Sequence, residues 1–111
     1  MNDLNSFLQK HSFKKIIVVQ GLGFVGSVMS LVCANAINGD YAVIGVDLPN
    51  NSGKKIIDSL NNNVFPLIAE DPKIEQFYKK AVEKGNFFAT TEINAYKVAD
   101  VIIVDINLDV E

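Results

Sequence analysis

Cysteine, proline and tryptophan are scarce in this sequence, which contains 1 cysteine, 3 prolines and no tryptophan. The single Cys33 excludes an internal disulfide and a cysteine-based metal cluster. No apolar run approaches the roughly 20 residues that span a bilayer, and the first residues show no basic segment followed by an apolar one. We therefore expect a cytoplasmic protein with no membrane partner.

Positive charge is also limited, since 10 basic residues face 13 acidic ones and the net charge is -3. No basic cluster is interleaved with aromatic side chains. Such a surface offers no attractive field to a phosphate backbone, so nucleic acid is not an expected partner. The 111 residues form one domain or part of one. A chain of this size buries roughly 60 to 70% of its unfolded surface.

The most informative segment is a glycine-rich turn between a strand-like run and a helix-like run. The run Lys15–Gln20 is apolar, and GLGFVG follows it directly. Gly21 would allow the tight bend, Gly23 would let the backbone approach a pyrophosphate, and Gly26 would let helix and strand pack closely. Unpaired N–H groups and the dipole at the start of the next helix, expected over 24–38, would also attract the pyrophosphate.

An acidic residue, Asp47, closes the next strand-like run, Ala42–Asp47, about 20 residues beyond the glycines. Its carboxylate would accept hydrogen bonds from the adenosine ribose and would repel the 2′-phosphate of NADP. Glycine turns also serve as plain structural ends, and a strand-end carboxylate can simply be solvated. Found together in one βαβ unit, the turn and Asp47 predict NAD as the cofactor.

Strand-like and helix-like segments alternate along the rest of the chain. Helices are expected in the first dozen residues and over 54–61, which follows a loop LPNNSG. Two more are expected over 72–84, capped by Asp71, and from a Thr91 cap to about 99. Strands are expected over 86–90 and 101–105.

This order predicts an α/β fold of the Rossmann type, a partial doubly wound parallel sheet of about four strands in the order 3-2-1-4 with flanking helices. The sequence stops in the loop after the fourth strand. We therefore expect an incomplete NAD-binding domain over 15–111, truncated after strand four, and an N-terminal extension over 1–14.

Several polar side chains fit a structural role as well as a functional one. Lys54 and Lys55 could reach adenine or phosphate, or could lie on a solvated helix face. Asp105 and Asn107 emerge beside the switch point where such sheets bind ligands, and either cofactor proximity or a solvated loop explains them. Cys33 falls on the packing face of a helix, where a thiol behaves as a small buried hydrophobe.

Several segments, in order, resemble the N-terminal NAD-binding domain of the UDP-glucose/GDP-mannose dehydrogenase family over roughly 15–107. GLGFVG is similar to the family's GxGYVG turn and GVD to the end of its second strand, while FPLIAEDPKIEQF and NFFATTEINAYKVADVIIV resemble later segments. The resemblance implies that Asp47 holds the ribose, that Lys55 matches a basic residue near adenine, and that six residues line the pyrophosphate turn. These six are Gly21, Leu22, Gly23, Phe24, Val25 and Gly26.

The loop after the fourth strand departs from the family pattern. Typical members have valine, a variable residue, threonine and proline beside the nicotinamide half, where this chain has Ile106, Asn107, Leu108 and Asp109. We assign Asn107 as the cofactor contact of this loop. The missing threonine indicates a divergent branch.

Family members oxidise a nucleotide-sugar alcohol to a carboxylate in two NAD-dependent steps, through a cysteine thiol ester in a later domain. The resemblance therefore implies a nucleotide-sugar substrate for the full-length parent only. We expect no catalytic or metal-binding residue in this chain and no activity of the chain alone.

Two other functions share the turn and the acid. A regulatory nucleotide-sensing module has both and needs no catalytic residues, and a methyltransferase has both but usually lacks the third glycine. The sugar and the oligomeric state do not follow from the sequence, and a homo-oligomer stays open.

Overall fold

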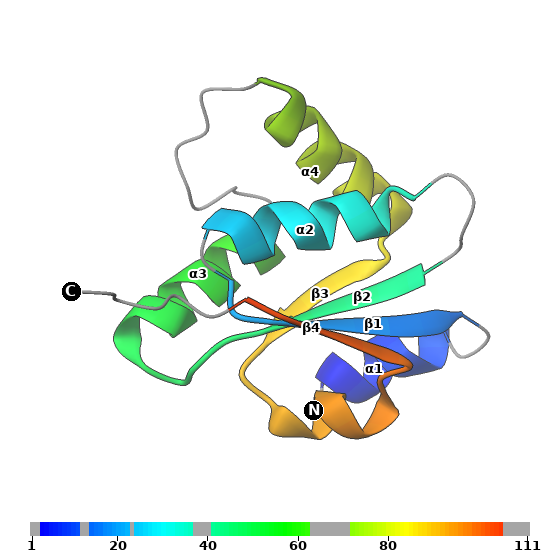
Figure 1. Cartoon of the computed structure of the whole chain (residues 1–111), viewed down its shortest axis with the longest axis vertical. Coiled ribbons are helices and arrows are strands. Elements are labelled where there is room, and N and C mark those ends of the chain that lie inside the picture. Colours follow the sequence, from blue (N-terminus) through cyan, green and yellow to red (C-terminus); the bar gives the residue numbers. More distant parts are fainter. Residues whose placement is uncertain (1–2, 12–13, 23, 37–40, 63–71, 106–111) are drawn as a thin grey trace.

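The computed structural model describes residues 3–11, 14–22, 24–36, 41–62 and 72–105. Its elements are labelled in Figure 1. They are α1 (Asp3–Lys10), β1 (Lys15–Gln20), α2 (Phe24–Ala34), β2 (Tyr41–Val46), α3 (Asn51–Asn61), α4 (Pro72–Lys84), β3 (Phe87–Thr90), η1 (Ile93–Val98) and β4 (Val101–Val104). No helix in these ranges is long and apolar enough to cross a membrane.

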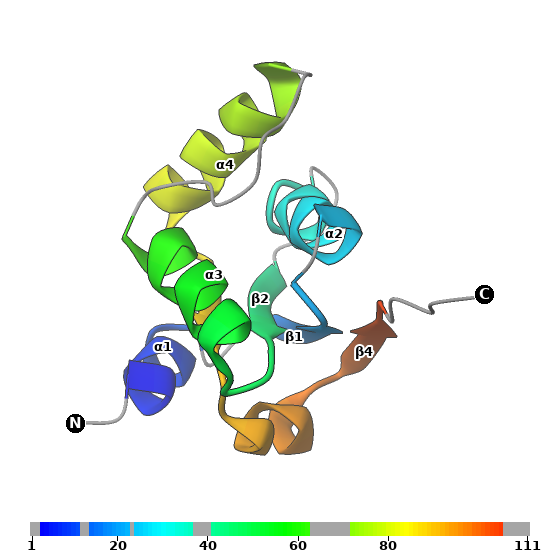
Figure 2. The ribbon, with the colours of Figure 1, turned by 90° about the vertical axis from the view of Figure 1, so that its left-hand side faces the viewer.

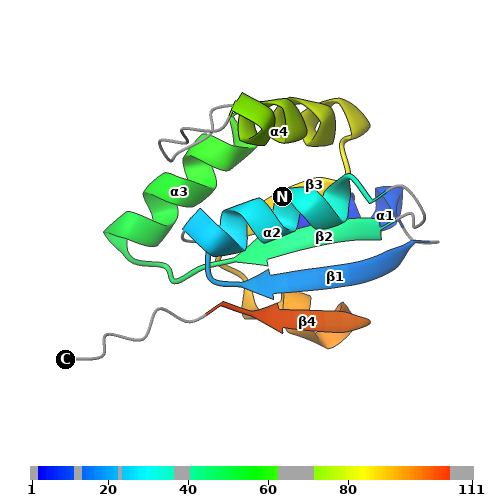
Figure 3. The same cartoon turned by 45° about the horizontal axis from the view of Figure 1, so that its top comes forward.

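The strands form one sheet in the order β3-β2-β1-β4, and every pair is parallel (Figure 3). The central strand β1 pairs Lys15 with Tyr41 of β2 and Ile17 with Val101 of β4. Parallel strands all end at the same edge of a sheet, so the segments that follow them meet there. The predicted fold class and the strand order 3-2-1-4 are confirmed.

Helices cover both faces of the sheet, with α2, α3 and α4 on one side and α1 and η1 on the other (Figure 2). Successive strand residues point to opposite faces, so a strand buried on both faces reads as a continuous apolar run. Val18 and Val19 in β1, and Val43 and Ile44 in β2, are accordingly fully buried. The two central strands therefore hold their C-terminal ends rigidly at one edge.

The N-terminal helix α1 packs on the same face as η1, which confirms the predicted first helix. Leu4 and Phe7 are buried. The centroid of the Phe7 ring lies 5.5 Å from that of the Phe88 ring and 4.6 Å from that of the His11 ring. His11 Nε2 lies 2.9 Å from the carbonyl oxygen of Gly85, so the ring donates from Nε2. This contact fixes the end of α1 to the turn before β3. The domain boundary at residue 14 stays a prediction.

The helix α3 begins before its predicted start at Lys54. Asn50 caps it, because the Asn50 side-chain oxygen accepts a hydrogen bond from the N–H of Gly53 at 2.8 Å. The prediction of LPNNSG as a loop is therefore wrong for Asn51–Gly53, which form the first turn of the helix.

The helix α2 ends at Ala34 instead of near residue 38. The carbonyl oxygen of Ala34 accepts hydrogen bonds from Asn86 Nδ2 at 2.8 Å and from Lys84 Nζ at 2.9 Å. These tertiary hydrogen bonds satisfy the Ala34 carbonyl oxygen, which a further turn of α2 would otherwise pair with a backbone N–H. The predicted end of this helix was wrong because that contact joins segments far apart in the sequence.

The other predicted helix ends have mixed outcomes. The predicted Thr91 cap is wrong, since η1 starts after Glu92 and Thr90 Oγ1 accepts the Glu92 N–H at 3.1 Å. The Asp71 cap lies outside the described residues. Gly85 follows α4 with φ of 67°, as expected for a glycine that terminates a helix.

Candidate functional site

The glycine turn leaves the C-terminal end of β1 in a conformation that requires glycine. Gly21 has φ of 95°, and its N–H donates to the carbonyl oxygen of Val46 in β2 at 2.8 Å. A Cβ on Gly21 would overlap the backbone oxygen of Asp105, and a Cβ on Gly26 would overlap the backbone oxygen of Gly21. The turn, the start of α2 and the end of β4 therefore meet at backbone contact distance.

Leu22 contributes its backbone to this turn and its side chain to the core. The side chain is fully buried, and it lies so close to β2 that a Cβ on Gly45 would sit 2.6 Å from Leu22 Cδ2. Ser27 Oγ donates to the Leu22 carbonyl oxygen at 3.0 Å from within α2. Leu22 thus fixes the turn between the sheet and the helix.

Asp47 lies at the end of β2 directly beside this turn. Its Oδ2 accepts the N–H of Leu22 at 2.9 Å, and its Oδ1 accepts the N–H of Leu48 at 2.7 Å. The Asp47 N–H itself donates to the carbonyl oxygen of Thr90 at 3.2 Å. Each carboxylate oxygen can accept a second hydrogen bond, so Asp47 is held in place and still able to bind hydroxyl groups.

Tyr96 of η1 lies within reach of the Asp47 charge, and the sequence does not predict this. Partial burial raises the pKa of the Tyr96 phenol, and the negative charge of Asp47 raises it further. Asp47 directly follows β2 and Tyr96 lies in η1, and no short motif joins them. Only the crossover that places η1 beneath β1 and β2 brings Tyr96 toward Asp47.

The start of α2 offers backbone donors beside the turn. The helix begins at Phe24, with Val25 and Gly26 next, and its first turn holds no acidic residue. The first N–H groups of a helix have no partner within it, and the helix dipole places partial positive charge there. The structure thus brings Gly21, Leu22 and the first turn of α2 to one place. The predicted contact Gly23 lies outside the described residues.

Asp105, which follows β4, also reaches the glycine turn. Its N–H donates to the carbonyl oxygen of Gln20 at 2.8 Å, and its Oδ2 would lie 3.1 Å from a Cβ placed on Gly26. The structure thus places the half-buried Asp105 beside the turn, and both roles that the sequence leaves open for it stay predictions. Asn107, the assigned contact of this loop, lies outside the described residues.

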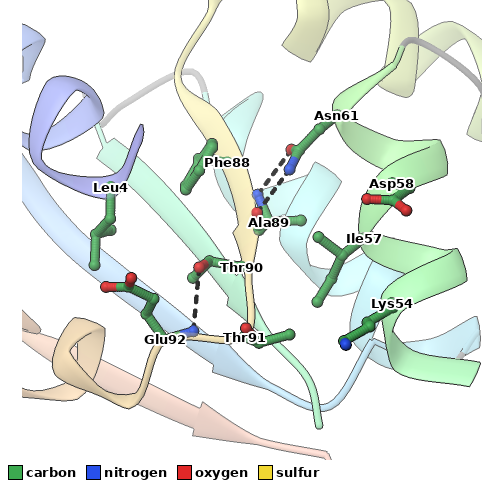
Figure 4. A pocket seen from close by; sticks show the side chains of 10 residues that line it. All are labelled: Leu4, Lys54, Ile57, Asp58, Asn61, Phe88, Ala89, Thr90, Thr91 and Glu92. Carbon is green, nitrogen blue, oxygen red and sulfur yellow. Dashed lines mark hydrogen bonds between the residues drawn. The ribbon is translucent and has the colours of Figure 1, made fainter. Parts of the chain in front are cut away.

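The predicted basic contact, Lys55, is exposed on α3, and no contact within the described ranges joins it to Asp47. Its neighbour Lys54 instead lines a groove of about 670 Å³ along the outer edge of β3 (Figure 4). Asn61 closes that edge, since Nδ2 donates to the Ala89 carbonyl oxygen at 2.7 Å and Oδ1 accepts the Ala89 N–H at 3.1 Å. The groove contains neither Asp47 nor the glycine turn, so we assign it no cofactor role.

The described part of the chain contains no group of three histidine, cysteine or acidic side chains that could hold a metal ion. Cys33 is half-buried on α2, and burial raises the pKa of its thiol. A raised pKa disfavours the reactive thiolate, as the predicted packing role requires.

Comparisons with known proteins agree with this geometry. Residues 14–108 match the model of the UDP-glucose/GDP-mannose dehydrogenase family, NAD binding domain. The chain is also similar to the crystal structure of NDP-N-acetyl-D-galactosaminuronic acid dehydrogenase from Methanosarcina mazei Go1, with 28% sequence identity and a TM-score of 0.76. The match covers 96% of this chain and 22% of the dehydrogenase chain. No curated protein matches. The chain therefore belongs to the UDP-glucose/GDP-mannose dehydrogenase family, and residues 14–108 correspond to its NAD-binding domain.

Proposed function

We propose that the glycine turn and Asp47 bind the adenosine and pyrophosphate part of NAD. The observation that carries this proposal is the hydrogen bond of 2.9 Å between Asp47 Oδ2 and the N–H of Leu22. It joins the acid at the end of β2 to the turn after β1, so that both act on one bound ligand. The turn residues in this proposal are Gly21, Leu22, Gly23, Phe24, Val25 and Gly26.

The backbone of the turn and the Asp47 carboxylate support NAD on physical grounds. The positions of Gly21 and Gly26 leave no room for a Cβ, which lets the turn, the start of α2 and the end of β4 pack at backbone contact distance, as a dinucleotide-binding turn requires. The first turn of α2 supplies backbone donors for the pyrophosphate. Asp47 accepts from the ribose hydroxyls and opposes a 2′-phosphate, which favours NAD over NADP.

The proposed substrate of the whole protein is a nucleotide sugar, whose alcohol is oxidised to a carboxylate with two NAD per sugar. The family and the uronic acid dehydrogenase with 28% identity support this class. Bound NAD supplies the nicotinamide that accepts hydride, and the residues of this chain hold the other half of the molecule. Because the chain spans 22% of that dehydrogenase, we propose that the sugar site and the catalytic cysteine belong to other parts of the parent.

Two further assignments rest on the resemblance. Lys55 near adenine and Asn107 near the nicotinamide half stay predictions. We also propose a cytoplasmic location, where nucleotide sugars are available as substrates. A regulatory module without catalysis is the weaker candidate, since the matched family consists of dehydrogenases.

Titration calorimetry with NAD tests the cofactor assignment. We expect weak binding, because affinity shared between two half-sites is reduced when only one is present. Asp47→Ala should weaken NAD binding about 10- to 100-fold, the equivalent of one charged hydrogen bond or more. Asp58→Ala is the matched control, since Asp58 is an exposed carboxylate on α3 away from the turn. Equal binding by wild type and Asp47→Ala would refute the assignment.

A further inference from the structure

Asp105 is held against the glycine turn by its own backbone. Its N–H donates to the carbonyl oxygen of Gln20 at 2.8 Å, and its carbonyl oxygen lies where a Cβ of Gly21 would be. Asp105 is half-buried, so solvent reaches only part of it. The position of its Cα is therefore fixed by β1 and the turn.

The Asp105 carboxylate points toward the first turn of α2. Its Oδ2 would be 3.1 Å from a Cβ on Gly26, the third residue of that helix. The positive end of a helix dipole favours an anion at this place. No ion pair joins Asp105 to a cationic side chain of the described ranges, and the first turn of α2, which its Oδ2 approaches, is also where a pyrophosphate would bind.

We propose that Asp105 is a specificity-determining residue that opposes phosphate-bearing ligands at the glycine turn. This inference rests on the proposed NAD site. The carboxylate offsets the positive field of α2 in the free protein and repels the pyrophosphate when it enters. Binding energy then depends more on the adenosine end, at Asp47, than on the phosphates.

Charge repulsion of this kind has a predictable size. Two unit charges about 4 Å apart in water repel by about 1 kcal/mol, which corresponds to about fivefold in affinity, and the factor grows as water is excluded. Asparagine in place of Asp105 removes the charge and keeps the size of the side chain. Adenosine carries no phosphate, so its binding should not respond to this charge.

The test measures the binding of NAD, ADP and adenosine to wild type, Asp105→Asn and Asp105→Ala by calorimetry, with Asp58→Asn as the control on α3. We expect both Asp105 variants to bind NAD and ADP at least about fivefold more tightly than wild type, and adenosine within about twofold. The advantage of Asp105→Asn should shrink as salt rises from about 0.05 to about 1 M, because salt screens exposed charges. Asp58→Asn should leave all three affinities unchanged.

Two outcomes overturn the Asp105 proposal alone. If Asp47→Ala weakens adenosine binding while Asp105→Asn leaves the NAD-to-adenosine affinity ratio unchanged, Asp105 only stabilises the helix end. If Asp105→Asn weakens NAD binding, the carboxylate assists the ligand instead of opposing it. If neither wild type nor the Asp105 variants bind NAD, ADP or adenosine, the proposed function fails together with this inference. Far-ultraviolet circular dichroism shows whether each variant is folded.

Discussion

At the scale of single residues, the candidate site consists of backbone groups that a few side chains hold in place. The placing of Gly21, Gly26 and Asp47 beside one another could be predicted from the sequence, because their spacing within one βαβ unit brings them to the same edge of the sheet. Asp105 and Tyr96 could not be assigned in this way. Their place beside the turn and beside Asp47 depends on which strands and crossovers become neighbours, and no local spacing encodes that.

Gly26 and Gly85 give a matched test of packing against backbone strain. A Cβ at Gly26 would overlap the backbone oxygen of Gly21, whereas a Cβ at Gly85, with φ of 67°, would have no atom within 4 Å. Gly85→Ala should cost about 1 kcal/mol for the left-handed conformation. Gly26→Ala should cost about 3 kcal/mol or more, because rigid backbone must move. Urea unfolding measures both, and equal losses would contradict the close contact at Gly26.

Tyr96 offers a spectroscopic test of its proximity to Asp47. Burial and the Asp47 charge both raise the pKa of its phenol, so Asp47→Asn should lower that pKa. Ultraviolet absorbance follows the phenolate as pH rises. In a Tyr96→Phe background, Asp47→Asn should leave the ultraviolet absorbance of the protein unchanged at every pH.

The raised pKa of Tyr96 also has a consequence for stability. A group whose pKa is higher in the folded state stabilises the fold fully below the pKa of an unfolded tyrosine, which is about 10. That contribution is lost as pH rises through the folded pKa. The unfolding free energy should therefore fall above about pH 10, less steeply in Tyr96→Phe. If the Tyr96 phenol titrates identically in wild type and Asp47→Asn, the charge of Asp47 does not act on Tyr96.

At the scale of elements, one buried asparagine joins three segments. Asn86 is fully buried, and its Nδ2 donates to the carbonyl oxygens of Ala34, at the end of α2, and of Tyr41, at the start of β2. The backbone carbonyl oxygen of Asn86 accepts the N–H of Val43 at 2.8 Å. This junction explains why α2 ends before the sequence pattern predicts. Helix periodicity is local, whereas the partner that ends the helix lies 52 positions further along the chain.

Removal of this side chain should therefore destabilise the fold. Asn86→Ala removes the side-chain donor from the carbonyl oxygens of Ala34 and Tyr41, and each lost hydrogen bond costs about 0.5 to 1.5 kcal/mol. The control is Asn62→Ala, because Asn62 is an exposed cap whose Nδ2 donates only to the Asp58 carbonyl oxygen. We expect a loss below about 1 kcal/mol for the control. Comparable losses in chemical denaturation would contradict the role of Asn86 as a junction.

At the scale of the whole molecule, the strand order was the most predictable property. Apolar runs separated by helices form parallel sheets, and the crossovers between parallel strands are almost always right-handed. Few strand orders satisfy this rule. The continuous burial of Val18 and Val19, and of Val43 and Ile44, follows from that arrangement. The placement of α1 was less predictable. Its amphipathic pattern indicates a helix, but only the contacts of Phe7 and His11 define the face that it covers.

The central claim is that NAD binds at the glycine turn and Asp47. Nitrogen–proton correlation NMR of the whole chain, titrated with NAD, reads each backbone amide separately. We predict the largest shifts at the amides of Leu22, Gly26 and Leu48, which surround the turn and the Asp47 carboxylate. The amides of the groove beside β3, such as Ala89 and Thr91, should move little. Shifts confined to that groove, or no shifts at saturating NAD, would contradict the account.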